Sequence, residues 1–286
     1  MSANLKRRCG ILLGAAFIIL SILALLPEAD VDHDTGYISS ELNIQETVDG
    51  SVTGTSYVNS DGVITEAIDM GYATVCRMWD ENGRIIEERY LDANGDPVAR
   101  YDDYYGVSYE YDETSTVITY LDAEGNPIIR SDGYSTIIRT QIDSMASEDF
   151  YYDLDGQQVQ CSGGYYGLHH WYNSDGQNTG MTFLDKDGHA VCSSSDYAGV
   201  TYQYNMDGTF VGQQYFDTEG NPVRASLGQY GELYQRNEQG YISQITFLDA
   251  DGNPAPANAG YTILKRTYHR DGTVAVSYTH LTLPTT

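Results

Sequence analysis

The sequence predicts an all-β fold of tandem hairpin repeats, each about 32 residues long, after one N-terminal hydrophobic helix. Three observations support this prediction: the composition, a motif that recurs in register, and a strand-like alternation of side chains between the copies of that motif. The 286 residues include 26 Tyr and 29 Gly but only 7 Pro. Tyr favours strands and Gly favours turns, so many short strands joined by tight turns are expected. Hydrophobic residues make up 41% of the chain, enough for a core despite a net charge of −26.

The N-terminus combines a basic cluster with an apolar run. Residues 1–8 contain Lys6, Arg7 and Arg8, and residues 9–27 are almost entirely apolar. A helix over the 17 residues 10–26 of this run spans about 26 Å, just short of a ~30 Å hydrocarbon core. We expect an uncleaved membrane anchor, with a cleaved signal peptide as the alternative. By the positive-inside rule, residues 1–8 are cytoplasmic and the rest of the chain is extracellular, or secreted if the signal is cleaved.

Residues 28–56 are acidic, contain Ser, Thr and Gly, and show little periodicity. They are predicted to form a stalk that separates a repeat array from the membrane.

A motif ending in glycine recurs through residues 57–275. Its copies are YLDANGDPV (90–98), YLDAEGNPI (120–128), YYDLDGQQV (151–159), FLDKDGHAV (183–191), YFDTEGNPV (215–223) and FLDADGNPA (247–255). The glycines of these copies follow one another at spacings of 30, 31, 32, 32 and 32 residues. A hairpin of this size is unstable alone, so neighbouring copies must stack to share a core.

One copy shows how the local sequence predicts a hairpin. Residues 197–204 alternate apolar and polar side chains, as a half-buried strand does, and residues 205–208 supply a turn ending in Gly208. Residues 210–216 form the returning strand. Pro222 lacks an N–H, so it is expected at a strand's first residue or on an edge. About seven such units predict a solenoid, a spiral or an open stacked sheet.

The pattern Y-x-Y-D-x-x-G…Y-L-D-x-x-G-N-P-V over residues 57–274 resembles the tyrosine-aspartate (YD, Rhs-type) repeats of bacterial surface and secreted proteins. It resembles the aromatic cell-wall-binding repeats more loosely. The period here is longer than that of YD repeats, and Trp79 and Trp171 are the only tryptophans. The resemblance implies a bacterial, exported, all-β array. A wall-binding array would further imply recognition of sugar or choline.

The C-terminal segment does not follow the repeat. Residues 276–285 read VSYTHLTLPT, which resembles a translated sequencing adapter. We therefore expect residues 276–286 to be a non-native tail and the native chain to continue beyond Ala275.

Several aromatic residues are candidates for a sugar-stacking platform: Tyr104, Tyr105, Tyr165, Tyr166 and Trp171. Aromatic rows also build the cores of hairpin arrays, and this structural interpretation is favoured. The adjacent pairs Tyr104–Tyr105 and Tyr165–Tyr166 are expected to be the more exposed, because neighbouring residues on a strand point to opposite faces.

The acidic turns and the histidines predict no metal site. Asp185 and Asp187 stand two residues apart, as at the start of a calcium loop, but the other ligands of such a loop are missing. Turn chemistry accounts for these residues. His169 and His170 are neighbours and cannot comfortably chelate one metal ion. No catalytic motif occurs, so we expect no catalytic residues, no cofactor and no enzyme activity.

Cys161 and Cys192 occupy nearly equivalent places in adjacent repeats. A disulfide between them is one interpretation and two buried thiols are the other.

The strong negative charge excludes nucleic acid as a partner. We expect a non-enzymatic, membrane-anchored surface protein that binds a glycan or protein ligand or serves as a spacer. One alternative is an extracellular appendage of a larger enzyme or toxin that is cut short after Ala275. Another is a cell-wall or glycan-binding module.

Overall fold

A computed structural model describes residues 42–67, 70–100, 103–269 and 274–280. The expected N-terminal helix and most of the expected stalk lie outside these residues. Within the described ranges, no helix has the length and hydropathy needed to cross a membrane.

The described chain forms sixteen strands. The first eight are β1 (Asn43–Asp49), β2 (Val52–Val58), β3 (Thr74–Trp79), β4 (Ile85–Leu91), β5 (Gly106–Tyr111), β6 (Ser115–Leu121), β7 (Thr136–Asp143) and β8 (Ala146–Tyr152). The second eight are β9 (Gly167–Tyr172), β10 (Asn178–Leu184), β11 (Gly199–Tyr204), β12 (Phe210–Phe216), β13 (Gly231–Arg236), β14 (Ile242–Leu248), β15 (Ile263–Tyr268) and β16 (Val274–His280).

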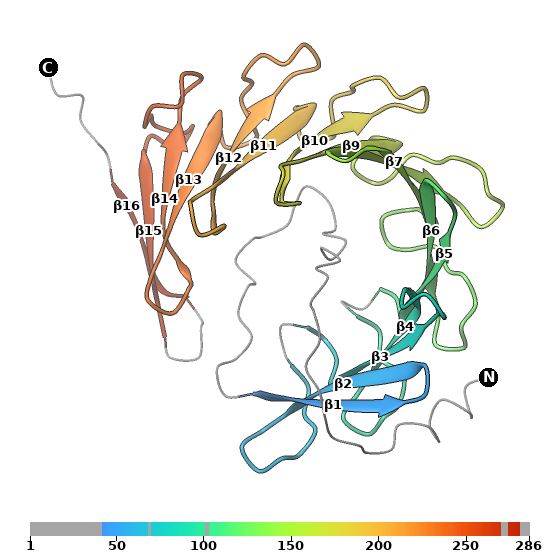
Figure 1. Cartoon of the computed structure of the whole chain (residues 1–286). Coiled ribbons are helices and arrows are strands. Elements are labelled where there is room, and N and C mark those ends of the chain that lie inside the picture. The colour runs from blue at the N-terminus through green and yellow to red at the C-terminus, as the bar shows by residue number, and fades with distance from the viewer. Residues whose placement is uncertain (1–41, 68–69, 101–102, 270–273, 281–286) are drawn as a thin grey trace, which may run out of the picture. The chain divides into compact units, whose positions relative to one another are not determined.

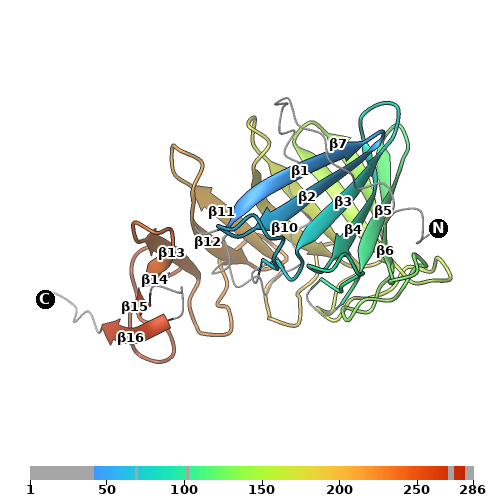
Figure 2. The same cartoon turned by 90° about the horizontal axis from the view of Figure 1, so that it is seen from below.

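The strands follow one another in the sheet in the order of the chain, from β1 to β16 (Figure 1). In the second view, β1 to β6 again lie side by side in chain order (Figure 2). The prediction of an all-β array of tandem hairpins is confirmed. The described chain divides into two compact units, one formed by the residues up to Arg139 together with Tyr151–Gln157 and one formed by Thr140–Phe150 together with the residues from Gln158 on.

The hairpin expected around residues 197–216 is confirmed. β11 and β12 pair in antiparallel fashion, and a bulge lies between Gln203 and Tyr204. Pro222 lies outside the named strands, where it makes an isolated bridge with Phe216. Because that position needs no ladder N–H, the proline is tolerated there.

The sheet begins earlier than the sequence predicts. β1 and β2 occupy residues 43–58 and pair along their whole length, within the segment expected to be a stalk. β1 is an end strand with mostly exposed side chains, so its sequence is polar and its periodicity is weak. At the other end, β16 pairs with β15 as far as His280, inside the segment expected to be a tail.

Four strands start with a glycine that the neighbouring strand requires. These are Gly106, Gly167, Gly199 and Gly231, which begin β5, β9, β11 and β13. A Cβ atom on Gly106 would lie 2.5 Å from the carbonyl oxygen of Glu88 on β4. Absence of a side chain therefore lets one hairpin approach the next closely.

Candidate functional site

A continuous row of tyrosine rings forms the core of the first unit. Its members are Tyr57, Tyr72, Tyr90, Tyr104, Tyr120, Tyr134 and Tyr151, with neighbouring ring centroids 4.4 to 6.0 Å apart. We call this row the tyrosine ladder. It takes alternate rungs from the even-numbered strands and from the segments that precede the odd-numbered strands. Each hairpin is thus bound to the next by aromatic contacts, as stacking of unstable single hairpins requires.

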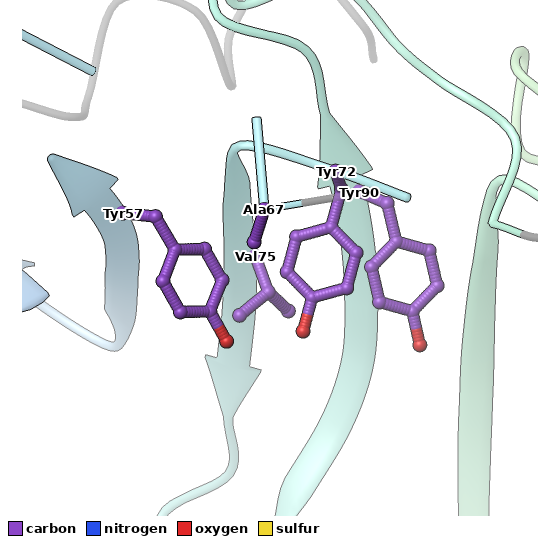
Figure 3. Close-up of a cluster of buried hydrophobic side chains, with 5 residues drawn as sticks. All are labelled: Tyr57, Ala67, Tyr72, Val75 and Tyr90. Atoms are coloured by element: carbon purple, nitrogen blue, oxygen red, sulfur yellow. The ribbon is translucent and has the colours of Figure 1, made fainter. Parts of the chain in front are cut away.

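Three rungs of the ladder stand in one buried cluster. Figure 3 shows the rings of Tyr57, Tyr72 and Tyr90 side by side, with Val75 and Ala67 beside them. Burial raises the pKa of Tyr72 and Tyr90 above the ordinary value of a phenol. These rings are therefore neutral at physiological pH and serve as apolar core.

The second unit has a similar row. Tyr165, Phe183, Tyr197 and Tyr215 contact one another in sequence, with centroids 4.5 to 5.5 Å apart. Phe183 is fully buried, so a rung functions without a hydroxyl group.

A polar pair interrupts this row after Tyr215. Gln229 occupies a rung position. The backbone carbonyl of Gln229 accepts the N–H of Ala225, and in the same way the carbonyl of the rung Tyr134 accepts the N–H of Arg130. Its Nε2 donates to Glu232 Oε1 at 2.8 Å, and both side chains are buried. The hydroxyl of Tyr234 also donates to Glu232. In another repeat, the position of Gln229 is the aromatic Tyr134 and the position of Glu232 is the apolar Ile137. Here both positions are polar.

A buried arginine packs against the ladder of the first unit. The guanidinium of Arg130 lies 4.5 Å from the ring centroid of Tyr120 and 5.4 Å from that of Tyr104. Its Nε donates to Asp103 Oδ2 at 2.8 Å, and its Nη2 lies 2.9 Å from Asp132 Oδ2. Its charge is thus neutralised by carboxylates, so this group is a structural element.

The acidic turns hold their own backbone. Asp217 Oδ1 accepts the N–H groups of Glu219 at 2.9 Å and Asn221 at 2.8 Å. The same pair of bonds recurs at Asp80, Asp92, Asp153, Asp185 and Asp249, and with an amide oxygen at Asn59, Asn173 and Asn237. Because an amide serves equally well, the turn needs an oxygen acceptor and not a metal-binding charge.

Backbone N–H groups also lower the pKa values of several of these turn carboxyls, namely Asp80, Asp92, Asp122, Asp185 and Asp217. The carboxylate form is stabilised because it accepts those hydrogen bonds. Among the described residues, no group of three His, Cys, Asp or Glu side chains is placed to hold a metal ion.

The two adjacent histidines on β9 have separate partners. His169 Nδ1 lies 2.9 Å from Glu148 Oε1, whereas His170 Nε2 lies 3.3 Å from Asp149 Oδ2. Consecutive strand residues point to opposite faces, so the two rings do not converge on one ion.

Cys161 and Cys192 are not joined by a disulfide. Both are thiols in the structure, Cys161 buried and Cys192 exposed. Cys161 donates its backbone N–H to Tyr165, and the residue with the same bond in the next repeat is Ser193. Cys192 is therefore one position out of register with Cys161, which also explains why it is not buried.

The five predicted platform residues separate into three groups. Tyr104 and Tyr165 are rungs, and Tyr165 is only 1% exposed. Tyr105 and Tyr166 are half-buried, and their backbone N–H groups donate to Leu121 and Leu184 at 2.8 Å. Trp171, on β9, is 50% exposed. The structure brings Tyr165, Tyr166 and Trp171 into one unit. Trp171 is the most exposed of the five, so the expectation that the adjacent tyrosines are the more exposed is wrong, because their rings pack in or beside the core row.

Trp171 has a defined setting on β9. Its ring centroid lies 4.1 Å from that of His169, at an interplanar angle of 46°. Its cross-strand neighbours are Ala146 on β8 and Gly180 on β10. Sequence reasoning had no means of finding these small neighbours, because they depend on strand register.

A small hollow lies beside Cys76 in the first unit, lined by Val52, Met78, Glu87 and Arg89 among others. It has room for about one water molecule, too little for an organic ligand.

No family model matches the chain. No curated protein matches it either. Among solved structures, a porin-like protein from Bacteroides uniformis is similar over 83% of this chain and 93% of that one, with 10% identity and a TM-score of 0.21. A likeness of that size carries no inference about function.

Proposed function

We propose that this protein is a non-enzymatic scaffold at the bacterial cell surface, anchored by its N-terminal hydrophobic segment, that presents a repeat array to a partner. The observation that carries the proposal is that aromatic and acidic side chains are already engaged in building the fold. Eleven of the aromatic rings are rungs of the two core rows, and the turn carboxylates accept backbone N–H groups. A residue already engaged in this way is poorly placed for acid–base chemistry.

The charge of the chain supports an extracellular position and limits the partners. A net charge of −26 repels phosphate backbones and anionic lipid surfaces. An uncharged or cationic partner is therefore expected.

The repeat architecture supports a presenting or spacing role. Each hairpin contacts its neighbours along the chain, so an array of this kind lengthens by adding repeats without changing the others. Such an array gives a partner a long sheet surface, with ligand-specific residues added at single positions.

Cys192 provides a direct test of location. Intact bacteria that produce the full chain would be treated with a membrane-impermeant maleimide, and labelling at Cys192 would be read by peptide mass spectrometry. We expect labelling of intact cells, because Cys192 is exposed while Cys76 and Cys161 are buried. The Cys192→Ser variant is the matched control for other thiols. Labelling that appears only after lysis would overturn the proposed location.

A further inference from the structure

β1 lies at one end of the sheet and pairs with β2 on one side only. The pairing covers residues 43–49 without a bulge. Tyr57 of β2 donates its N–H to the Ala73 carbonyl and accepts the Thr65 N–H, so its backbone groups point away from β1. Its cross-strand partner Ile44 is therefore in a non-hydrogen-bonded pair, and the N–H and C=O of Ile44 point to the open edge.

Two further residues of β1 turn their backbone groups to this edge. Alternate residues of a strand have the same orientation, so Glu46 and Val48 follow Ile44. Within the described part of the chain, no hydrogen-bond partner reaches the outward groups of these three residues. The edge therefore offers another strand a row of free N–H donors and C=O acceptors.

The side chains of the same three residues lie on the face that carries the tyrosine ladder, because Ile44 is directly opposite the rung Tyr57. Ile44 is 56% exposed and Val48 is 52% exposed. Glu46, between them, is also exposed and makes no ion pair with any other described residue. The edge thus presents an acidic group between two apolar ones.

β3 shows what a neighbouring strand does to a residue in this position. Val75 of β3 is opposite the rung Tyr90, as Ile44 is opposite Tyr57, and it packs beside these rings (Figure 3). β2 lies along β3, with Thr55 opposite Val75, and Val75 is only 2% exposed. A strand added to β1 would bury Ile44 in the same way and would continue the stacking of the array.

We propose that the open edge of β1 binds an extended segment of a partner protein by strand addition, an inference that rests on the proposed function of presenting the array to a partner. Backbone hydrogen bonds to Ile44, Glu46 and Val48 provide affinity, and alternate side chains of the segment provide selectivity.

The charge of the edge defines the segment that fits. Glu46 and Asp49 are the only charged residues of β1, and the whole chain has a net charge of −26. Side chains directly opposite one another on neighbouring strands interact, and opposite charges there are favourable. The matching segment therefore carries Lys or Arg opposite Glu46, with an apolar residue two positions before it and another two positions after it.

The same charge disfavours a second copy of this chain as the occupant. Antiparallel pairing of two β1 strands that places Ile44 opposite Val48 of the second copy also places the two Glu46 side chains opposite each other. Like charges in that arrangement are destabilising. A register shifted by two residues separates the acids but places an apolar side chain opposite Glu46.

Peptide binding to the purified full chain in detergent provides the test. The peptide Thr-Val-Thr-Lys-Thr-Val-Thr, capped at both ends and labelled with an uncharged fluorophore, would be titrated with the protein and followed by fluorescence anisotropy. We expect saturable binding, and binding at least about fivefold weaker when Glu replaces the Lys of the peptide. A third peptide, methylated at the backbone nitrogens of its Val and Lys residues, cannot donate to the edge and should not bind.

Charge reversal at Glu46 tests whether binding occurs at this edge. Glu46→Lys should make the Glu peptide bind more tightly than the Lys peptide. Glu238→Lys, at an exposed turn, changes the net charge equally and should leave the original preference unchanged. Glu46→Pro should abolish binding without lowering the melting temperature, because the proline removes an outward N–H that β2 does not use.

Three results would contradict the proposal. Equal binding of the methylated peptide would show attraction between charges without strand addition. No binding of the Lys peptide would show that the edge does not accept it, as when other residues of the same chain cover β1. A dimer in analytical ultracentrifugation that Glu46→Pro abolishes would assign the edge to a second copy. Because these assays use purified protein, their outcome is independent of Cys192 labelling on cells.

Discussion

Tyr134 and Tyr151 stack with their ring centroids 4.4 Å apart and their planes at 16°, and their side chains are only 2% and 1% exposed. Tyr134 precedes β7 and Tyr151 lies near the end of β8, so one stacked pair closes a hairpin onto the segment that begins it. The tyrosine ladder therefore stabilises each repeat against the next through buried aromatic contacts.

Removal of one rung should destabilise the fold strongly. Tyr151→Ala is expected to lower the free energy of unfolding by about 3–5 kcal/mol, because a buried aromatic ring is lost and a cavity remains. Tyr151→Phe should cost less than about 1.5 kcal/mol, since Phe183 already serves as a rung in the second unit. Urea unfolding measures both. Equal losses in the two variants would show that the hydroxyl, and not the ring, is what matters.

The turn carboxyls should make the protein sensitive to acid. The pKa of Asp217 is lowered in the folded state, mainly by the backbone N–H of Asn221. Its contribution to stability is therefore fully present above the unfolded pKa of about 3.9 and is lost as the pH falls through the folded pKa. Asp80, Asp92, Asp122 and Asp185 have the same sign. We expect melting temperatures to hold near neutral pH and to fall below about pH 4.

The Asp217→Asn variant is the control for this acid response. An amide oxygen occupies the same place at Asn59, Asn173 and Asn237, so the turn should form. The loss of stability between pH 5 and pH 3 should be smaller than in the parent protein. An identical acid response would assign the effect to other carboxyls.

Much of the fold could be predicted because repetition makes local signals visible. The Asp-x-x-Gly turns and the strand at residues 210–216 follow from residue type and period. β1 could not be recognised, because an end strand with exposed side chains resembles a polar linker. The need for glycine at Gly106, the start of β5, could not be predicted from local turn chemistry. It arises because Glu88 on the neighbouring strand approaches closely.

The candidate site was predictable only in part. Trp171 could be identified as unusual from composition, but Tyr165 could not be distinguished from it, because burial depends on which strand face meets the neighbouring repeat. Gln229 and Glu232 were not among the residues identified from the sequence. Their contact became clear only from the placement of both side chains in one buried row.

Deletion of whole repeats tests the contribution of that polar pair. Residues 185–216 and residues 217–248 are each one 32-residue repeat, and both deletions rejoin equivalent positions. Both shortened chains should fold, because each hairpin interacts with its neighbours only. Deletion of 217–248 removes Gln229 and Glu232 and brings Tyr261 to the rung after Tyr215. It should therefore cost less stability than deletion of 185–216.

Urea unfolding measures the two deletion variants. Their m-values should fall by similar amounts, since both lose similar buried surface. A greater loss of stability on deletion of 217–248 would show that the buried hydrogen bonds of Glu232 stabilise the array more than an aromatic rung does.

Arg130 should contribute far more to the stability of the fold than its position in a loop indicates. Its side chain is 8% exposed and lies between Asp103 and Asp132. Arg130→Met retains the apolar bulk but leaves Asp103, itself only 11% exposed, without its counter-charge. Breaking a buried pair in this way should cost about 3–5 kcal/mol. Asp103→Asn combined with Arg130→Met should recover part of that loss, because the buried negative charge is removed as well.

Arg224 is the matched control for Arg130. Its guanidinium lies 5.5 Å from the ring centroid of Tyr230, but its side chain is exposed. Arg224→Met should change the free energy of unfolding by about 1 kcal/mol or less, because an exposed cation–π contact is weak. If both variants cost the same, the contact of Arg130 with the rings, and not its burial beside Asp103, determines its effect. A large cost for Arg130→Met alone would assign the stabilisation to the buried ion pair.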